Sequence, residues 1–371
     1  MEITVSKSEL LRELTATQGV VERKTTIPIL SNYLFEAAGD KLSLTATDLD
    51  LSLRTSCNVK VKKEGSCTIP ARKLYDYVKL LPDADITIKL LENHWVSIRC
   101  GRSNTKMVGM ARSNFPTLPA FPMAGAVKIP AKVLRGMIAR TGFAIANEES
   151  RYTLNGALMV LKPESITMVA TDGHRLAHVE RPGEKFEGVS GELKTLVPKK
   201  AMDELKSLLD STDDEAVEFA KDESTLFFRI GPRLLTSRQL TGQFPNFEAV
   251  LPKDNNKSIH LHGDELGSAI SRVAQFADER SRAVRLKLEK GELKLSASST
   301  ETGESEDSLE AEYNGEPLTI GFNAAYILDF LKASGSADVK LELKDAQSAG
   351  QLRPADSEDY KYRYIVMPMR I

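Results

Sequence analysis

One alternating pattern of apolar and polar positions occurs three times along the chain. Residues 42–48 (LSLTATD) form a strand with one buried face, and the pattern returns at 166–172 and 293–299, at spacings of 124 and 127 residues. A second pair of similar segments, 30–34 and 154–158, shows the same spacing of 124. Because the two similarities are in register, the sequence predicts three copies of one unit of about 120 residues.

Each copy also carries two helical patterns. In the second one, apolar residues follow Ile69, Val197 and Ile320 at offsets of 5, 8 and 11, which places them on one helix face. We expect Ser6 and Asp264 to cap the first helices of their copies. The first helices show apolar residues three to four positions apart: Leu10, Leu11 and Leu14; Val133, Leu134, Met137 and Ile138; Leu266, Ala269, Ile270 and Val273.

Hairpins are expected near the ends of the copies. Hairpins are predicted at 95–110 and 226–240, with turns at Gly101 and at Gly231-Pro232. Together with the alternating strands, these patterns indicate an α+β fold of three repeated modules, each with two helices and about eight strands.

Two similar segments mark the module boundaries. Residues 114–119 and 243–252 contain Asn-Phe-Pro and Gln-Phe-Pro, 129 positions apart, and each continues to a Leu-Pro pair. We interpret both as linkers, which predicts modules at 1–120, 121–252 and 253–371. Sheet edges left open at the ends of such a row are expected to pair, and closure into a ring would pair them.

Composition is typical of a chain that folds throughout, with 41% hydrophobic and 27% charged residues in 371. The N-terminal residues lack the apolar stretch of a signal peptide, so we expect a cytoplasmic protein with no membrane partner. Cys57, Cys67 and Cys100 form no CxxC pair and are expected to be free thiols rather than a disulfide or zinc framework. No metal or cofactor is predicted.

Charge is distributed unevenly although the net charge is only −2. Residues 1–120 hold 17 basic and 13 acidic side chains, residues 121–252 hold 17 and 18, and residues 253–371 hold 16 and 21. The resulting net charges of +4, −1 and −5 suit chains that meet head to tail, although uneven solvated surfaces would give the same numbers.

Catalytic signatures such as GxGxxG, GxxxxGK[ST], GxSxG and HExxH are absent from the sequence. The one cluster of titratable residues is at 171–176 (TDGHRL), which fits a hydrolase using Asp172 and His174, a plain structural turn, or a binding pocket. The matching strand end of the first copy, Asp48-Leu49-Asp50, has no histidine. This difference favours the binding pocket.

Two further features permit a structural and a functional interpretation. The chain ends in a predicted strand that runs into Met367-Pro368-Met369, which is either an edge strand or a surface where flexible methionines accept several partners. The six predicted helices carry many lysines and arginines, which are either ordinary solvated residues or a lining that contacts phosphates without reading sequence.

These motifs together resemble the DNA polymerase III β-subunit family, the bacterial DNA sliding clamps. The resemblance covers essentially the whole chain. It rests on the three-module length and on five segments: 25–30 (TTIPIL), 151–156 (RYTLNG), 170–176 (ATDGHRL), 320–323 (IGFN) and 366–371 (VMPMRI).

The resemblance implies a non-enzymatic processivity factor. In this family a head-to-tail homodimer forms a ring that encircles double-stranded DNA without sequence preference and tethers the replicative polymerase. DNA polymerases, the clamp loader and repair proteins dock through short linear peptides, and loading requires a separate ATPase. Two alternatives remain: a repeat-built scaffold that binds proteins without encircling DNA, and the hydrolase using His174 and Asp172.

Family positions carried over to this chain give a peptide-binding set between the second and third modules. Ala249, Ser281 and Gln347 depart from the larger side chains expected nearby, which predicts a shallower rim. The set comprises Leu154, Thr171, Gly173, His174, Arg175, Leu176, Pro245, Val250, Asn323, Tyr326, Ile365, Met367, Pro368, Met369 and Arg370.

The same resemblance implies a dimer contact and a set of DNA contacts. Glu148 stands where an uncharged residue is expected near the DNA. The dimer contact joins Lys73, Arg102 and Met107 of one chain to Gln275, Phe276, Glu301 and Glu304 of the other. The DNA candidates are Lys24, Arg72, Lys79, Arg151, Lys199, Lys200 and Lys206.

Overall fold

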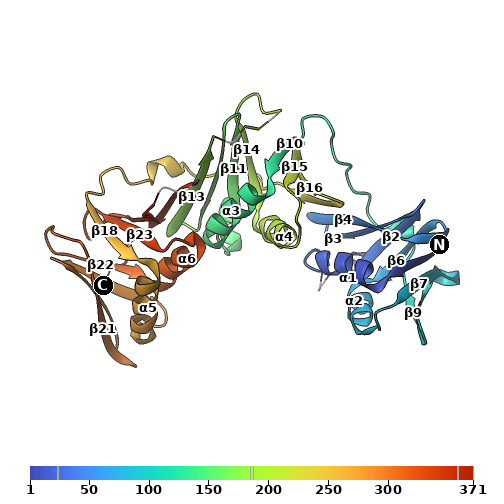
Figure 1. Ribbon diagram of the computed structural model, residues 1–371, viewed down its shortest axis with the longest axis horizontal. Coiled ribbons are helices and arrows are strands. Elements are labelled where there is room, and N and C mark those ends of the chain that lie inside the picture. Colours follow the sequence, from blue (N-terminus) through green and yellow to red (C-terminus); the bar gives the residue numbers. More distant parts are fainter. Residues whose placement is uncertain (23–24, 184, 187, 357–358, 371) are drawn as a thin grey trace. The chain divides into compact units, whose positions relative to one another are not determined.

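A computed structural model describes residues 1–22, 25–183, 185–186, 188–356 and 359–370 (Figure 1). The chain packs as two compact units, one of Met1–Lys132 with Lys200–Gln239 and one of Val133–Lys199 with Leu240–Ile371. The division passes through the predicted second module, so each unit combines a terminal module with part of the central one. The boundaries predicted at 120 and 252 remain predictions.

The first unit contains a five-stranded sheet in the order β5-β1-β7-β8-β9 and an eight-stranded sheet in the order β10-β15-β16-β17-β4-β3-β2-β6. Its elements are β1 (Glu2–Ser6), α1 (Lys7–Ala16), β2 (Asn32–Ala38), β3 (Lys41–Thr47), β4 (Leu51–Asn58), β5 (Lys60–Lys63), β6 (Gly65–Pro70), α2 (Ala71–Leu80), β7 (Asp85–Leu90), β8 (Trp95–Cys100), β9 (Ser103–Val108), β10 (Val127–Pro130), α4 (Lys199–Asp210), β15 (Ala216–Lys221), β16 (Thr225–Ile230) and β17 (Arg233–Arg238).

The second unit has an eight-stranded sheet in the order β14-β11-β12-β13-β25-β24-β23-β18 and a four-stranded sheet in the order β21-β20-β19-β22. Its elements are α3 (Ala131–Thr141), β11 (Gly156–Lys162), β12 (Ser165–Thr171), β13 (Arg175–Pro182), β14 (Leu193–Pro198), β18 (Lys257–His262), α5 (Gly263–Val273), β19 (Ala283–Glu289), β20 (Glu292–Ser299), β21 (Gly303–Glu310), β22 (Leu318–Asn323), α6 (Ala324–Ser334), β23 (Asp338–Leu343), β24 (Gly350–Pro354) and β25 (Lys361–Val366).

Each eight-stranded sheet continues from one predicted module into the next by pairing two strands. In the first unit β17 pairs antiparallel with β4, for example Leu235 opposite Leu53. In the second unit β25 pairs antiparallel with β13, for example Ile365 opposite Leu176. By position in the repeat, β17 matches β25 and β4 matches β13, so both junctions use the same two strand types. Their counterparts β9 and β21 are left as the end strands of the two smaller sheets.

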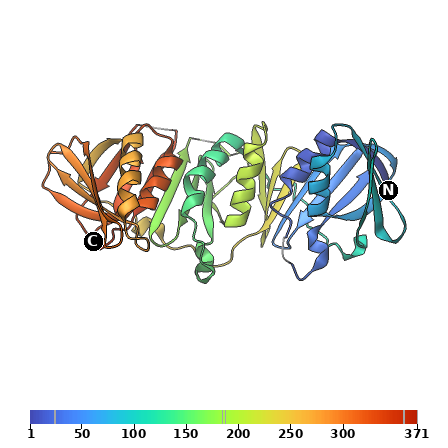
Figure 2. The same ribbon diagram turned by 90° about the horizontal axis from the view of Figure 1, so that it is seen from below.

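The predicted repeat of two helices per module is confirmed, and α1 with α2 and α5 with α6 lie side by side (Figure 2). Ser6 caps α1, because its hydroxyl accepts the amide of Glu9 at 3.3 Å. The cap predicted at Asp264 is wrong. Helix α5 begins directly at the end of β18, where the amide of Gly263 bonds to the carbonyl of Ala337, and Asp264 therefore lies inside the first turn.

Both predicted hairpins are present as β8–β9 and β16–β17. Their turns contain Gly101 at φ 54° and Gly231 at φ 52°, left-handed values that suit glycine. None of the helices in the described ranges combines the length and the apolar character that crossing a membrane requires.

Buried side chains from a predicted linker complete the core of the first module. Phe115 packs against Ile29, Leu30 and Leu34, so the Asn-Phe-Pro segment is anchored rather than free. All three cysteines are buried as free thiols, and burial raises the pKa of Cys57 and of Cys67 to about 12. These thiols are therefore protonated and serve as small apolar groups.

A buried ion pair joins α1 to β17 within the first unit. The Glu13 carboxylate accepts hydrogen bonds from Nε and Nη2 of Arg233 at 3.1 and 3.3 Å and from the Thr55 hydroxyl at 2.5 Å. The side chains of Glu13 and Arg233 are 2% and 7% exposed. Burial favours the neutral acid, but the bonds from Arg233, Thr55 and Arg12 outweigh it and lower the pKa of Glu13.

Replacement of Glu13 by Gln leaves Arg233 buried without its counter-charge. We expect the free energy of unfolding of this unit to fall by about 3 to 5 kcal/mol. Since the pKa of Glu13 is lower in the folded state, its contribution is present above the pKa of the unfolded carboxyl, about 4.3, and is lost as pH falls through the lowered value. The difference between the wild type and the variant should therefore shrink in acid.

Urea unfolding at several pH values measures this effect. Glu36→Gln is the matched control, because it removes one partner of an exposed pair with Arg112 at 3.3 Å and should cost under about 1 kcal/mol. Equal losses in the two variants, or a Glu13→Gln loss that does not depend on pH, would contradict the assignment.

Candidate peptide-binding site

Residues 171–176 form a tight hairpin that joins β12 to β13. The Asp172 carboxylate accepts the amides of His174 and Arg175 at 2.9 and 3.1 Å, and the Thr171 hydroxyl accepts the amide of Gly173 at 3.1 Å. Gly173 has φ +89°, a value that a residue with a Cβ atom adopts only with strain. Local hydrogen bonds thus fix the direction in which His174 and Arg175 leave the sheet.

The first module builds the same hairpin from different residues. Asp48 accepts the amides of Asp50 and Leu51 at 3.0 and 2.7 Å, and Thr47 accepts the amide of Leu49, which has φ 83°. The turn is therefore a feature of the repeat. What distinguishes the second copy is the pair of side chains that the turn presents, His174 and Arg175.

Arg175 joins three elements around this hairpin. Its guanidinium bonds to Asp172 at 3.0 Å, to Asp329 of α6 at 2.6 Å and to the carbonyl of Phe143 at 2.7 Å. It also lies over the ring of Tyr326, 4.4 Å from the centroid. With its side chain 11% exposed and held on all sides, Arg175 is a fixed part of the wall rather than a mobile surface charge.

Two tyrosines beside Arg175 remain protonated. Burial raises the pKa of Tyr364, whose hydroxyl lies 3.5 Å from the Arg175 guanidinium, and burial also raises the pKa of Tyr326, with the Asp172 carboxylate acting in the same direction. The phenol groups therefore remain neutral hydrogen-bonding groups at any physiological pH.

The chain end runs along the hairpin. The amide of Met367 donates to the carbonyl of His174 at 2.9 Å, and the amide of Met369 donates to the carbonyl of Gly321 at 2.8 Å. Pro368 lies between these two anchors and is half-buried, whereas the Met367 side chain is 40% exposed. These bonds place the tail beside the hairpin within the described residues, which end at Arg370.

An apolar cluster lies beside the hairpin and contains predicted residues from three segments. Leu154, Leu176 and Ile365 pack together in it. Sequence reasoning missed nine other members, among them four buried strand residues, Leu158, Val160, Val169 and Leu196, and five partly or fully buried residues outside the strands. Those five are Leu240, Phe244, Phe247, Leu251 and Ala349. The signal was available, since apolar side chains at 244, 247 and 251 are unusual in a free linker.

The remaining predicted residues lie around the same region or serve the fold. Pro245 is exposed next to Phe244, and Val250 closes the short turn by donating its amide to the carbonyl of Phe247 at 3.0 Å. Asn323 caps α6, because its side chain accepts the amide of Ala325 at 2.9 Å.

Ala249, Ser281 and Gln347, which depart from the family pattern, lie in different parts of the structure. Ala249 and Gln347 are exposed, in a short helical turn and in a loop. Ser281 instead lines a separate hollow with Asp278, Glu304 and Arg370. The shallower rim stays a prediction.

The geometry does not suit a hydrolase that pairs Asp172 with His174. One oxygen of Asp172 accepts two backbone amides and the other accepts Arg175. Both carboxylate oxygens are therefore occupied by hydrogen bonds to residues of the turn. Among the described residues, the carboxylate makes no hydrogen bond to the exposed His174 ring. A general base needs an orienting partner of this kind.

Residues predicted to contact DNA lie mainly on two helices. Arg72 and Lys79 are exposed on α2, and Lys199, Lys200 and Lys206 are on α4, where they pair with Asn147, Asp48 and Asp210. Arg151 pairs with Glu148 at 3.3 Å and bonds to the carbonyl of Asp172. Lys24 lies outside the described residues.

Of the residues predicted for the dimer contact, Met107 and Glu304 lie on the end strands β9 and β21, and the others lie in turns and helices. Arg102 is in the β8–β9 turn, Met107 is on β9 itself, and Lys73 is exposed on α2. In the second unit Glu304 is on β21, Glu301 precedes that strand, and Gln275 and Phe276 follow α5 in a short helical turn.

Comparisons with known proteins agree along the whole chain. Three family models of the DNA polymerase III β subunit match the chain. The N-terminal-domain model matches residues 1–119, the central-domain model residues 128–246 and the C-terminal-domain model residues 248–370. The β sliding clamps of Caulobacter vibrioides and Pseudomonas aeruginosa are 36% and 37% identical, over 100% of both chains. A crystal structure of the Pseudomonas aeruginosa clamp bound to griselimycin superposes with a TM-score of 0.94 at 36% identity and full coverage of both chains.

The repeated modules, the junctions made by paired strands and these full-length similarities define a sliding clamp. The chain belongs to the DNA polymerase III β-subunit family. A Caulobacter crescentus clamp, 34% identical with a TM-score of 0.93, was crystallised with polyethylene glycol bound to its putative β-motif tethering region.

Replacement of Arg175 by Lys keeps the charge but removes the planar fork that reaches Asp172, Asp329 and the Phe143 carbonyl. We expect the unit to lose about 2 kcal/mol of stability and the amide of Met367 to exchange hydrogen faster, since the hairpin would no longer be tied to α6 and to the Phe143 carbonyl. Arg238→Lys is the control, because its pair with Asp50 at 3.6 Å is largely exposed. Unchanged exchange at Met367 in Arg175→Lys would contradict this role.

Proposed function

We propose that the protein is a non-enzymatic processivity factor that closes into a head-to-tail homodimeric ring around double-stranded DNA. On the DNA it tethers the replicative polymerase, and it receives DNA polymerases, the clamp loader and repair proteins through short linear peptides. The proposal joins the sliding-clamp family to specific surfaces of this chain.

One observation carries the ring. Both junctions within the chain pair a strand of the β17 and β25 type with a strand of the β4 and β13 type. Among the described residues, the third strand of each type, β9 and β21, is the end strand of its sheet and has a strand partner on one side only. Within the chain, the counterparts of β9 pair with the counterparts of β21. The same pairing between two chains covers both end strands, so β9 of one chain pairs with β21 of another.

Charge on the two edges supports this pairing. The outward positions of β9 include Lys106, and Arg102 precedes the strand. The outward positions of β21 include Glu304, Glu306 and Glu310. Opposite charges across paired strands stabilise the pairing and disfavour like edges, so β9 with β9 and β21 with β21 are rejected.

Lysines and arginines of the helices supply the DNA contact. Arg72 and Lys79 of α2 and Lys199, Lys200 and Lys206 of α4 are candidates, with Arg151 and Lys24. The described lysines of α4 are each held by a neighbouring Asn or Asp side chain. Weak, screened contacts of this kind retain DNA inside a ring without arresting its movement.

The hairpin, the tail and the apolar cluster form the proposed peptide site. Leu154 offers partly exposed apolar surface that packs against the buried Leu176 and Ile365, His174 and Met367 are exposed, and Arg175 fixes the wall. Apolar anchors beside a few polar groups are the usual chemistry of short-peptide recognition. The commitment of Asp172 to its turn supports a binding role rather than catalysis.

Retention on circular DNA tests the ring. The protein should be loaded on a nicked circular plasmid by a clamp loader, purified with the plasmid, and followed after linearisation. A ring predicts stable retention on circles and loss from linear DNA, because sliding off the ends requires no bond to break. A protein-binding scaffold without encirclement predicts the same retention on both forms.

Binding of a partner-derived peptide tests the proposed peptide site separately from the ring. His174→Ala should weaken peptide binding while retention on circular plasmid persists, since His174 takes no part in the strand junctions. Turnover of an ester or peptide substrate that His174→Ala abolishes would support the hydrolase instead.

A further inference from the structure

The first and third modules differ at the outer edge of their opening strand. In the first module β5 pairs antiparallel with β1, with Ile3 opposite Val61 and Thr4 opposite Lys60. The β5 sequence is Lys-Val-Lys-Lys, and Lys62 pairs with Glu2 at 2.9 Å. A short basic strand of the chain itself thus covers the edge of β1.

The matching strand of the third module, β18, has no such cover. It ends its eight-stranded sheet, with β23 as its one strand partner among the described residues. Half of the backbone amides and carbonyls of an antiparallel edge strand point away from the partner strand. The edge of β18 therefore offers these groups to a further strand.

The segment that could cover β18 turns away instead. In the first module, the amide of Val59 after β4 bonds to the carbonyl of Asp40, and the chain continues as β5. In the third module, the amide of Ala311 after β21 makes the equivalent bond to the carbonyl of Gly291, but the chain then curls. The curl is closed by the amide of Tyr313 on the carbonyl of Ala311 at 2.8 Å. Residues 314–317 (NGEP) are turn formers, unlike the alternating residues of β5.

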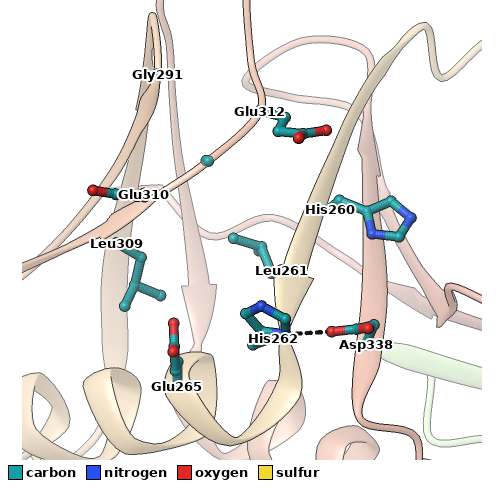
Figure 3. Close-up of a pocket in the computed structure, with 10 residues that line it drawn as sticks. His260, Leu261, His262, Glu265, Gly291, Leu309, Glu310, Glu312 and Asp338 are labelled. Atoms are coloured by element: carbon teal, nitrogen blue, oxygen red, sulfur yellow. Dashed lines mark hydrogen bonds and ion pairs between the residues drawn. The ribbon is translucent and has the colours of Figure 1, made fainter.

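A groove of about 710 Å³ remains beside β18 (Figure 3). Its walls are three consecutive residues of β18, His260 to His262, and the consecutive residues 309–312 at the end of β21 and beyond. Consecutive residues on both walls mean that the groove follows the backbone edge rather than one face of the sheet. Its β18 wall begins at His260, the counterpart of Thr4 in the first module, where β5 begins to pair with β1.

Acidic side chains surround the groove. Glu265 of α5, Glu310, Glu312 and Asp338 line it, and none of its lining residues is Lys or Arg. Asp338 bonds to His262, and Glu312 extends from its loop toward β18 (Figure 3). No three metal-ligating side chains converge in the described part of the chain, so the groove is not shaped for a single metal ion.

We propose that the open edge of β18 and its groove bind an extended segment of a partner protein that is rich in lysine or arginine. The segment adds as a strand antiparallel to β18, in the position that β5 holds in the first module. Its backbone pairs with β18, and its basic side chains meet Glu265, Glu310 and Glu312. The inference does not depend on the clamp function, since it rests on the comparison of two modules.

A peptide taken from the chain itself is the probe. The acetylated and amidated peptide of residues 58–65 (NVKVKKEG) carries a fluorophore, and its binding to the full-length protein is followed by anisotropy and by hydrogen exchange. We expect saturable binding together with slower exchange of the amides of β18. A version N-methylated at alternate residues keeps the charges but cannot pair, and should lose the protection of β18.

Two double variants separate the groove from general charge attraction. Glu265→Gln with Glu312→Gln should weaken binding about fivefold, as expected for two lost exposed ion pairs. Asp254→Asn with Glu279→Gln removes the same charge from exposed positions outside the groove and should leave binding unchanged.

Three results would overturn the proposal: equal binding by both double variants, binding without protection of β18, or undiminished binding of the N-methylated peptide. A fourth concerns a second copy of the chain. If the mass of the protein assembly without peptide falls in the Glu265 and Glu312 variant, the groove belongs to that contact and not to a basic partner segment.

Discussion

Backbone pairing at strand edges is the constraint on which this structure depends. An unpaired edge exposes amides and carbonyls that must find partners in water, in the same chain or in another chain. The repeat solves the problem twice within the chain in the same way, by β17 with β4 and by β25 with β13. Because this pairing is a property of the module, it also specifies that the remaining edges, β9 and β21, pair with each other.

The proposed peptide site lies at one of these junctions. Pairing of β25 with β13 brings the end of the chain beside the hairpin of the second module, so that Met367 meets His174. The hairpin itself needs only Thr171, Asp172 and Gly173, as the equivalent turn at Thr47 and Asp48 shows. The turn does not need the side chains of His174 and Arg175, and these are the side chains that the proposed site uses.

Most of the fold could be predicted from sequence because repetition multiplies a weak signal. One alternating strand is ambiguous, but three at matching spacing identify a module, and the helices at +5, +8 and +11 followed from it. The hairpin and the tail could be predicted as special because they break the repeat. The cap at Asp264 failed for a local reason, since α5 starts directly from β18 and leaves no separate capping residue.

Other features could not be predicted because they depend on pairings between distant segments. The Glu13–Arg233 pair joins residues 220 positions apart, and neither has a distinguishing neighbour in the sequence. Phe244 and Phe247 were interpreted as linker residues because the strand that they pack against, β25, lies more than 100 positions later. The difference between β5 and the 311–317 segment likewise became visible only when both edges were seen.

The most direct measurement is the protection of β9 and β21 from hydrogen exchange, recorded together with the solution mass of the protein. The account predicts a mass of twice the 40.9 kDa of one chain and slow exchange along both strands. It also predicts that Lys106→Glu lowers the mass toward one chain and exposes both strands at once. A single-chain mass, or a dimer in which β9 and β21 exchange as free edges, would contradict the claim that these two strands close the ring.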